Sequence, residues 1–155
     1  MSSILINIAD AIVFELNTPE QFVSGDYVFM AFSQAIAAAR TYDTERKLEE
    51  SELLQVDVVA GDIKQDVGTR SAQDGTYRID IAFRQTIDAS DTASLDALGA
   101  LVEEVGDYFF QRKRLRGLTH AMWKHGDVVY PYLPDRIRSD DRFVSLLRLT
   151  YRVIQ

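Results

Sequence analysis

Apolar residues recur every three to four positions in two stretches of the chain, the spacing that places them on one side of an α-helix. The first stretch runs from Ser3 to Asn17 and stops just before Pro19, which cannot continue a helix. The second follows Asp91, a residue suited to capping a first turn, and extends to Phe109. We therefore predict two amphipathic helices, each with an apolar stripe that faces a core.

Apolar and polar residues alternate in three other stretches, which is typical of strands with one buried face. The clearest alternation covers residues 77–83, and residues 54–60 and 143–153 show the same pattern. Residues 118–130, around Trp123, indicate one or two further strands. The apolar run 27–32 is too short to assign, and the alanine-rich run 35–40 fits a helix by propensity or a buried strand by context.

These elements predict the α+β class: an antiparallel or mixed sheet with two main helices packed on one face. With 155 residues, 46% of them hydrophobic and 26% charged, the chain has the size and composition of an ordinary single domain, which we place at residues 1–155.

A polar, glycine-bearing stretch at residues 61–75 separates two of the predicted strands and is longer than ordinary hairpin loops. We predict a loop that orders only when subunits assemble, and the alternative is a solvated hairpin tip without a partner. The candidate assembly residues are Gly61, Asp62, Lys64, Asp66, Gly68, Arg70 and Gly75.

Charge is distributed unevenly along the chain. The net charge of −7 disfavours nonspecific nucleic-acid binding. Acidic residues outnumber basic ones in residues 41–66, whereas basic residues predominate from Arg112 onward. These charges either form solvated faces that fold back on each other or attract identical subunits head to tail.

Catalytic chemistry finds little support in the sequence. The chain has no cysteine, no nucleophile elbow and no phosphate-binding glycine loop, so we expect neither an enzyme nor a cofactor. His120 and His125, with Asp127, are the only candidate metal ligands, but a spacing of five puts the two histidines on one face of neither a helix nor a strand. We expect a turn at residues 124–127, and a small metal-assisted hydrolase is the remote alternative.

Hydropathy gives no sign of a membrane or secretory segment. The first ten residues lack the basic start and unbroken apolar run of a signal peptide, and no stretch approaches the roughly 18 apolar residues that span a bilayer. We expect a soluble chain that is made in the cytoplasm.

The order of elements resembles that of the tail terminator (tail completion) proteins of long-tailed bacteriophages, and of related neck and minor tail proteins. The resemblance rests on helix 4–16, residues 38–42, strand 53–59, the polar loop with Arg70, strand 77–83, helix 95–109, the segment around Trp123, and strand 143–151. It covers nearly the whole chain, although the family has no short invariant motif.

The resemblance implies a structural virion protein that is made in the host cytoplasm and located at the tail–neck junction. Such a protein forms a ring, commonly of six subunits, that caps the tail tube and joins it to the head or neck. Its partners would be other copies of itself, the tail tube protein and head–tail connector proteins, with no specific nucleic acid, no membrane and no catalytic residue. A head–tail connector adaptor or a minor tail protein is the alternative.

Overall fold

Helix α1 (Ile4–Asn17) forms where the first apolar stripe predicts it. The computed structural model describes residues 3–43, 53–67 and 73–154. The side chain of Ser3 accepts a hydrogen bond from the backbone N–H of Ile6 (3.4 Å), which caps the first turn. The buried side chains of the helix share one face: Ile8, Ala9, Ile12, Glu15 and Leu16.

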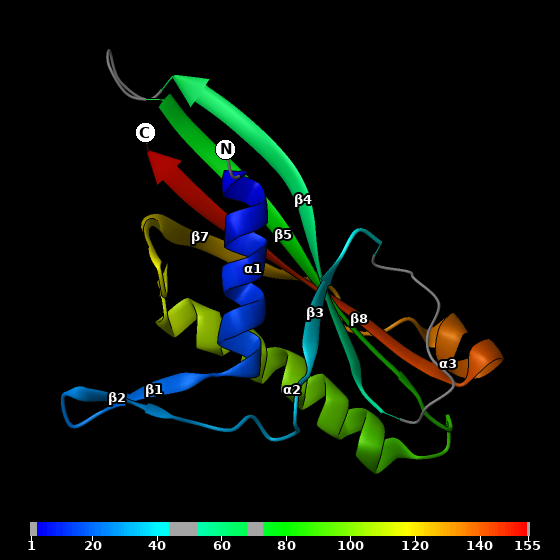
Figure 1. Cartoon of the computed structure of the whole chain (residues 1–155). Coiled ribbons are helices and arrows are strands. Elements are labelled where there is room, and N and C mark those ends of the chain that lie inside the picture. The colour runs from blue at the N-terminus through cyan, green and yellow to red at the C-terminus, as the bar shows by residue number, and fades with distance from the viewer. Residues whose placement is uncertain (1–2, 44–52, 68–72, 155) are drawn as a thin grey trace.

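Helix α2 (Thr92–Gln111) confirms the second predicted helix and the predicted cap. The Asp91 side chain accepts a hydrogen bond from the backbone N–H of Ser94 (3.2 Å). Its buried residues follow spacings of three and four: Leu98, Leu101, Val102, Val105, Tyr108 and Phe109. At about 1.5 Å per residue the helix is about 30 Å long and runs along the lower side of the molecule in Figure 1.

The main sheet has six strands in the order β3-β4-β5-β8-β7-β6. Their bounds are Ala38–Thr41 (β3), Gln55–Val67 (β4), Gln73–Thr86 (β5), Arg114–Leu115 (β6), Leu118–Tyr130 (β7) and Arg142–Ile154 (β8). Only β3 is parallel to its neighbour, and the other pairs are antiparallel. The sheet is therefore mixed, as the α+β prediction allows.

Both main helices cover the same face of the sheet. On that face Ile81 of β5 lies opposite Leu147 of β8, and Tyr77 lies opposite Tyr151. These side chains belong to one buried cluster that also contains the apolar stripes of α1 and α2. The two-layer arrangement predicted from the sequence is thus present, with α1 in front of the strands in Figure 1.

Two smaller elements lie outside this layered body. Strands β1 (Glu20–Val23) and β2 (Asp26–Phe29) pair only with each other, as a hairpin. Its two central residues, Ser24 and Gly25, have positive φ angles of 52° and 90°, as tight hairpin turns require. Helix α3 (Pro134–Asp140), which the sequence did not predict, lies at the other end of the molecule (Figure 1).

The loop predicted at residues 61–75 is largely wrong. Strand β4 continues to Val67 and β5 begins at Gln73, with Gln65 opposite Gly75. The register shifts between Ala60 and Ile63 by one extra residue, a β-bulge that interrupts the alternation read from the sequence. A side chain on Gly61 would come within 2.9 Å of the Arg78 carbonyl oxygen, so glycine is needed at this bulge.

The turn predicted at residues 124–127 is also wrong, because these residues lie inside β7. Register shifts between Trp123 and His125, and between Val128 and Tyr130, interrupt the alternation there. The alanine-rich run 35–40, for which helix and strand were both open, contributes to strand β3.

Candidate functional site

His120 and His125, the candidate ligands of the remote metal-site alternative, both lie on β7. Both are exposed, and His125 Nε2 lies 3.8 Å from Asp127 Oδ2. No group of three His, Asp or Glu side chains among the described residues is placed to hold a metal ion.

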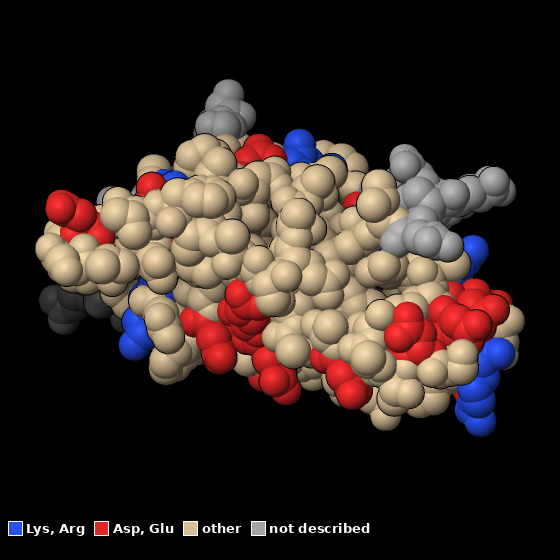
Figure 2. All heavy atoms as spheres, turned by 90° about the horizontal axis from the view of Figure 1, so that it is seen from below, with Lys and Arg blue, Asp and Glu red and all other residues tan. Residues whose placement is uncertain are grey.

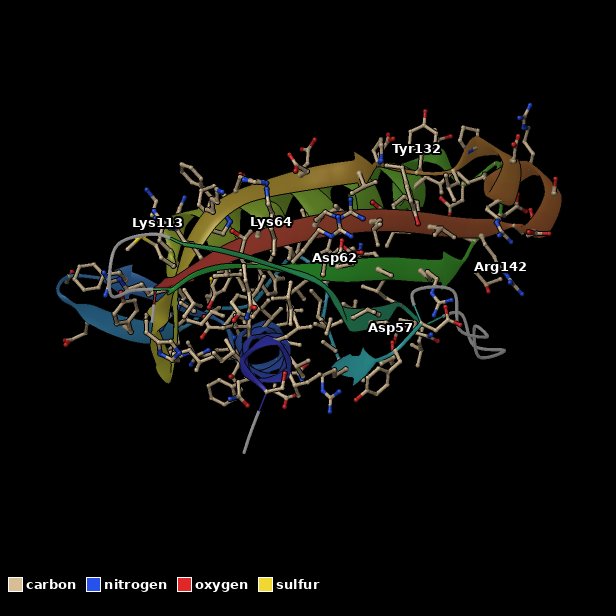
Figure 3. The ribbon with its side chains drawn as sticks, turned by 90° about the horizontal axis from the view of Figure 1, so that it is seen from above. Asp57, Asp62, Lys64, Lys113, Tyr132 and Arg142 are labelled. Carbon is tan, nitrogen blue, oxygen red and sulfur yellow. The ribbon has the colours of Figure 1, made fainter. Side chains whose placement is uncertain are left out.

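The candidate assembly residues lie mainly on the paired ends of β4 and β5. Asp62 and Lys64 are exposed on β4 (Figure 3), and Asp62 forms an ion pair with Arg78 of β5. Gly75 is buried, and a side chain there would collide with the Tyr77 ring at 2.8 Å. Asp66 belongs to β4, while Gly68 and Arg70 lie outside the described residues.

The β1–β2 hairpin exposes large apolar side chains on an element outside the main sheet. Phe22 is 64% exposed, Tyr27 59% and Phe29 71%, and Val23 and Val28 are exposed as well. Water contact with so many large apolar groups on one small element is unfavourable and typical of surfaces that meet another molecule. Sequence reasoning noted the apolar run 27–32 but gave it no function.

The base of this hairpin is fastened to the body by polar contacts. The backbone N–H of Glu20 donates a hydrogen bond to the Tyr108 hydroxyl oxygen (3.2 Å). The guanidinium of Arg112 lies 4.6 Å from the centre of the Tyr27 ring, and Arg116 Nη1 lies 3.0 Å from Glu20 Oε1. Because α2 and the α2–β7 connection both contribute, the hairpin is held in a defined direction.

At the centre of these contacts is a fully buried carboxylate, Glu15 of α1. Arg112 Nε lies 2.7 Å from its Oε2, Arg116 Nε contacts its Oε1, and the Tyr108 hydroxyl donates a hydrogen bond to Oε2 (2.9 Å). Two arginines and a hydroxyl thus compensate the cost of burying this charge. We call Glu15, Glu20, Tyr108, Arg112 and Arg116 the Glu15 cluster.

The pKa shifts in the Glu15 cluster keep two of its groups, Tyr108 and Arg116, in one protonation state at neutral pH. Burial raises the pKa of Tyr108 to about 12, with a further contribution from the charge of Glu15. Burial alone would lower the pKa of Arg116, but its hydrogen bond and charge attraction to Glu15 raise it above its ordinary value. At neutral pH the hydroxyl therefore keeps its proton and the arginine its charge.

The sequence contained a signal for this cluster. Glu15 follows Ile12 by three residues and precedes Leu16, so it lies on the apolar stripe of α1. An acidic residue on a buried stripe requires a compensating partner, and the basic run that begins at Arg112 supplies two.

Other basic residues of the C-terminal part also pair within the chain. Arg148 Nε lies 2.8 Å from Asp80 Oδ1, and Arg136 and Arg138 form ion pairs on α3. By contrast, α2 carries four acidic residues and no basic one: Asp96, Glu103, Glu104 and Asp107. Figure 2 views the molecule from below, the side along which α2 runs in Figure 1, and shows acidic side chains gathered across the lower half of that view.

Comparison with known proteins adds no family: no protein-family model matches the chain, and no curated protein shows significant similarity to it. Among the described residues, no helix combines the length and apolar character needed to cross a membrane.

Proposed function

We propose that this chain is a structural virion protein, a phage tail terminator whose copies form a ring, with six subunits as the expected number. The ring caps the tail tube and joins it to the head or neck. The element order supports this proposal, since it resembles that of the tail terminator family.

The observation that carries the proposal is the anchored, apolar hairpin. A flexible segment with exposed aromatic rings would fold back onto the body, but the Glu15 cluster holds the base of this hairpin while Phe22 and Phe29 remain in water. Such a surface fits a protein whose work is to bind neighbouring subunits.

The hairpin and α3 lie at different ends of the molecule, which favours contacts between unlike surfaces (Figure 1). Contacts of this kind close into rings when the rotation between subunits allows it. A ring around a tube therefore agrees with the shape of the subunit.

Electron microscopy of the purified protein, alone and mixed with tail tubes that lack a terminator, tests the proposal. We expect rings, and tubes that carry one ring at one end and become competent to join heads. Replacing Phe22 and Phe29 by serine should abolish the rings, whereas Tyr42→Ser, at an exposed aromatic outside the hairpin, should leave them intact. Protein that stays monomeric and does not bind tubes would contradict the proposal.

A further inference from the structure

The outer edge of β4 is open over the last part of the strand. Strand β3 pairs with β4 only from Val56 to Val59, so residues 61–67 of β4 have no strand on their outer side among the described residues. In Figure 1 this is the half of β4 that carries the arrowhead. An open edge presents backbone N–H and C=O groups that can pair with a strand of another molecule.

The two faces of this stretch are open as well. Residues 61–65 are all exposed, and Ile63 is 49% exposed, whereas Val56 and Val58 earlier in the same strand are buried. Beyond the bulge the strand is regular, since the register from Ile63 to Val67 shows no further shift. The end of β4 is therefore a straight, accessible edge.

We propose that two copies of the chain pair antiparallel through this edge, about a two-fold axis at Gln65. Gln65 then lies opposite Gln65 of the second copy. Lys64 lies opposite Asp66, which pairs a basic residue with an acidic one. Ile63 lies opposite Val67, which pairs two apolar residues. Each of these unlike pairs occurs twice, because a two-fold contact is the same from both sides.

Charge and space select this register among its neighbours. Moving the axis by one residue places Lys64 opposite Lys64 or Asp66 opposite Asp66, and like charges directly opposite each other are unfavourable. Moving it by two residues towards the start of β4 places the second copy beside Val59, where Thr41 of β3 already lies. The opposite shift runs past Val67, the end of β4.

The charges across β4 and β5 favour the same partner. Asp66 lies opposite Asp74 of β5, so two acidic residues share one row of the sheet. Lys64 lies in the neighbouring row, opposite Thr76, and forms no ion pair with any residue that the structure describes. In the paired form, Lys64 of the second copy enters the acidic row and offsets its charge.

This contact goes beyond the ring proposed above and does not depend on it. A two-fold contact joins copies that point in opposite directions. Copies in a ring around a tube all point the same way, so the β4 contact pairs subunits outside such a ring.

Disulfide crosslinking tests the two-fold axis, because the chain has no cysteine of its own. Side chains directly opposite each other have Cβ atoms about 4.5–5.5 Å apart, close to the spacing of a disulfide. We expect Gln65→Cys alone to form a dimer on oxidation, since this residue faces its own counterpart. Lys124→Cys, exposed on β7, is the matched control and should crosslink at least tenfold more slowly. Equal rates would overturn the proposal.

Charge reversal tests the register. In the Gln65→Cys protein, Lys64→Glu and Asp66→Lys each place like charges opposite each other twice, so each should slow crosslinking about tenfold. A mixture of the two proteins should crosslink rapidly as a mixed dimer, because every acidic side chain at these positions then faces a basic one. Single variants that crosslink as fast as the parent would refute the register and the proposal with it.

Competition and tail binding separate the remaining outcomes. If Gln65→Cys crosslinked to Asp26→Cys of the hairpin in preference to itself, the edge would belong to the hairpin and the proposal would be wrong. Protein that caps tails but never dimerises at Gln65 would refute the β4 contact and leave the tail function standing. Dimers at Gln65 in a protein that binds no tails would refute the tail function alone.

Discussion

The hairpin and the core face of the sheet are built from the same kinds of residue but lie in opposite environments. On the core face, Phe83 of β5 and Tyr151 of β8 are fully buried beneath the helices. On the hairpin, Phe22 and Phe29 remain mostly in water. Hydrophobic character alone therefore does not say whether a side chain stabilises the fold or is available to bind another molecule. What decides this is whether the side chain lies between the sheet and the helices or outside them.

The two regions also differ in what holds them in place. Apolar burial fixes the sheet against α1 and α2, whereas the hairpin is oriented chiefly by the ion pairs and hydrogen bonds of the Glu15 cluster. Core truncations should consequently lower stability, whereas changes at the hairpin surface should leave the stability of the monomer nearly unchanged.

The largest effect is expected from Phe109→Ala, which leaves a cavity beneath the buried face of α2. We expect a loss of about 3–5 kcal/mol in the free energy of unfolding, measured by denaturant titration. Phe110→Ala, one residue later at a side chain 51% exposed, is the matched control and should cost about 1 kcal/mol or less. Equal losses would break the distinction between buried and exposed positions.

Glu15→Gln should have the next largest effect, because it removes the buried charge that Arg112 and Arg116 share. We expect a loss of about 3 kcal/mol, measured in the same way. The control on the same helix is Asp10→Asn, whose exposed ion pair with Arg40 should contribute less than about 1 kcal/mol. If the two variants were equally stable, the Glu15 cluster would not be the anchor.

Stability should also fall at high pH because of Tyr108. Its pKa is about 12 in the fold and 10.0 when free, so above pH 10 the unfolded chain releases a proton that the fold retains. The contribution is complete below pH 10 and lost by about pH 12, and it amounts to about 2 kcal/mol. Tyr108→Phe should flatten this decline in unfolding experiments, although buried Tyr151, whose pKa is also raised, retains part of it. Parallel curves for the two proteins would contradict this assignment.

The smallest effect on stability should come from Phe22→Ser with Phe29→Ser. These side chains are already exposed, so thermal or denaturant unfolding of the monomer should shift by less than about 0.5 kcal/mol per site. A large loss would mean that the hairpin stabilises its own subunit and would remove the contrast with the core.

The α+β architecture was predictable because its main elements carry local patterns. The cap at Asp91 and the stripe that ends at Phe109 mark α2, and the alternation in residues 77–83 marks β5. These patterns involve residues close together in the sequence, so they can be recognised without knowledge of the tertiary structure.

The candidate site was less predictable because it depends on distant contacts and small irregularities. The bulge beside Gly61 hid the continuation of β4, and four-residue strands such as β1 are too short for periodicity to identify. Phe22 is exposed because its hairpin lies outside the main sheet, and the residues near Phe22 in the sequence do not indicate that position. Glu15 was detectable on its stripe, but its partners lie about 100 residues away.

The central place of β8 affects how the protein is made. A ribosome synthesises β5 and β7 before β8, yet β8 lies between them in the finished sheet. Until β8 has been synthesised, the edges of β5 and β7 that pair with β8 lack their backbone hydrogen-bond partners. The nascent chain therefore completes its sheet only after β8 has left the exit tunnel.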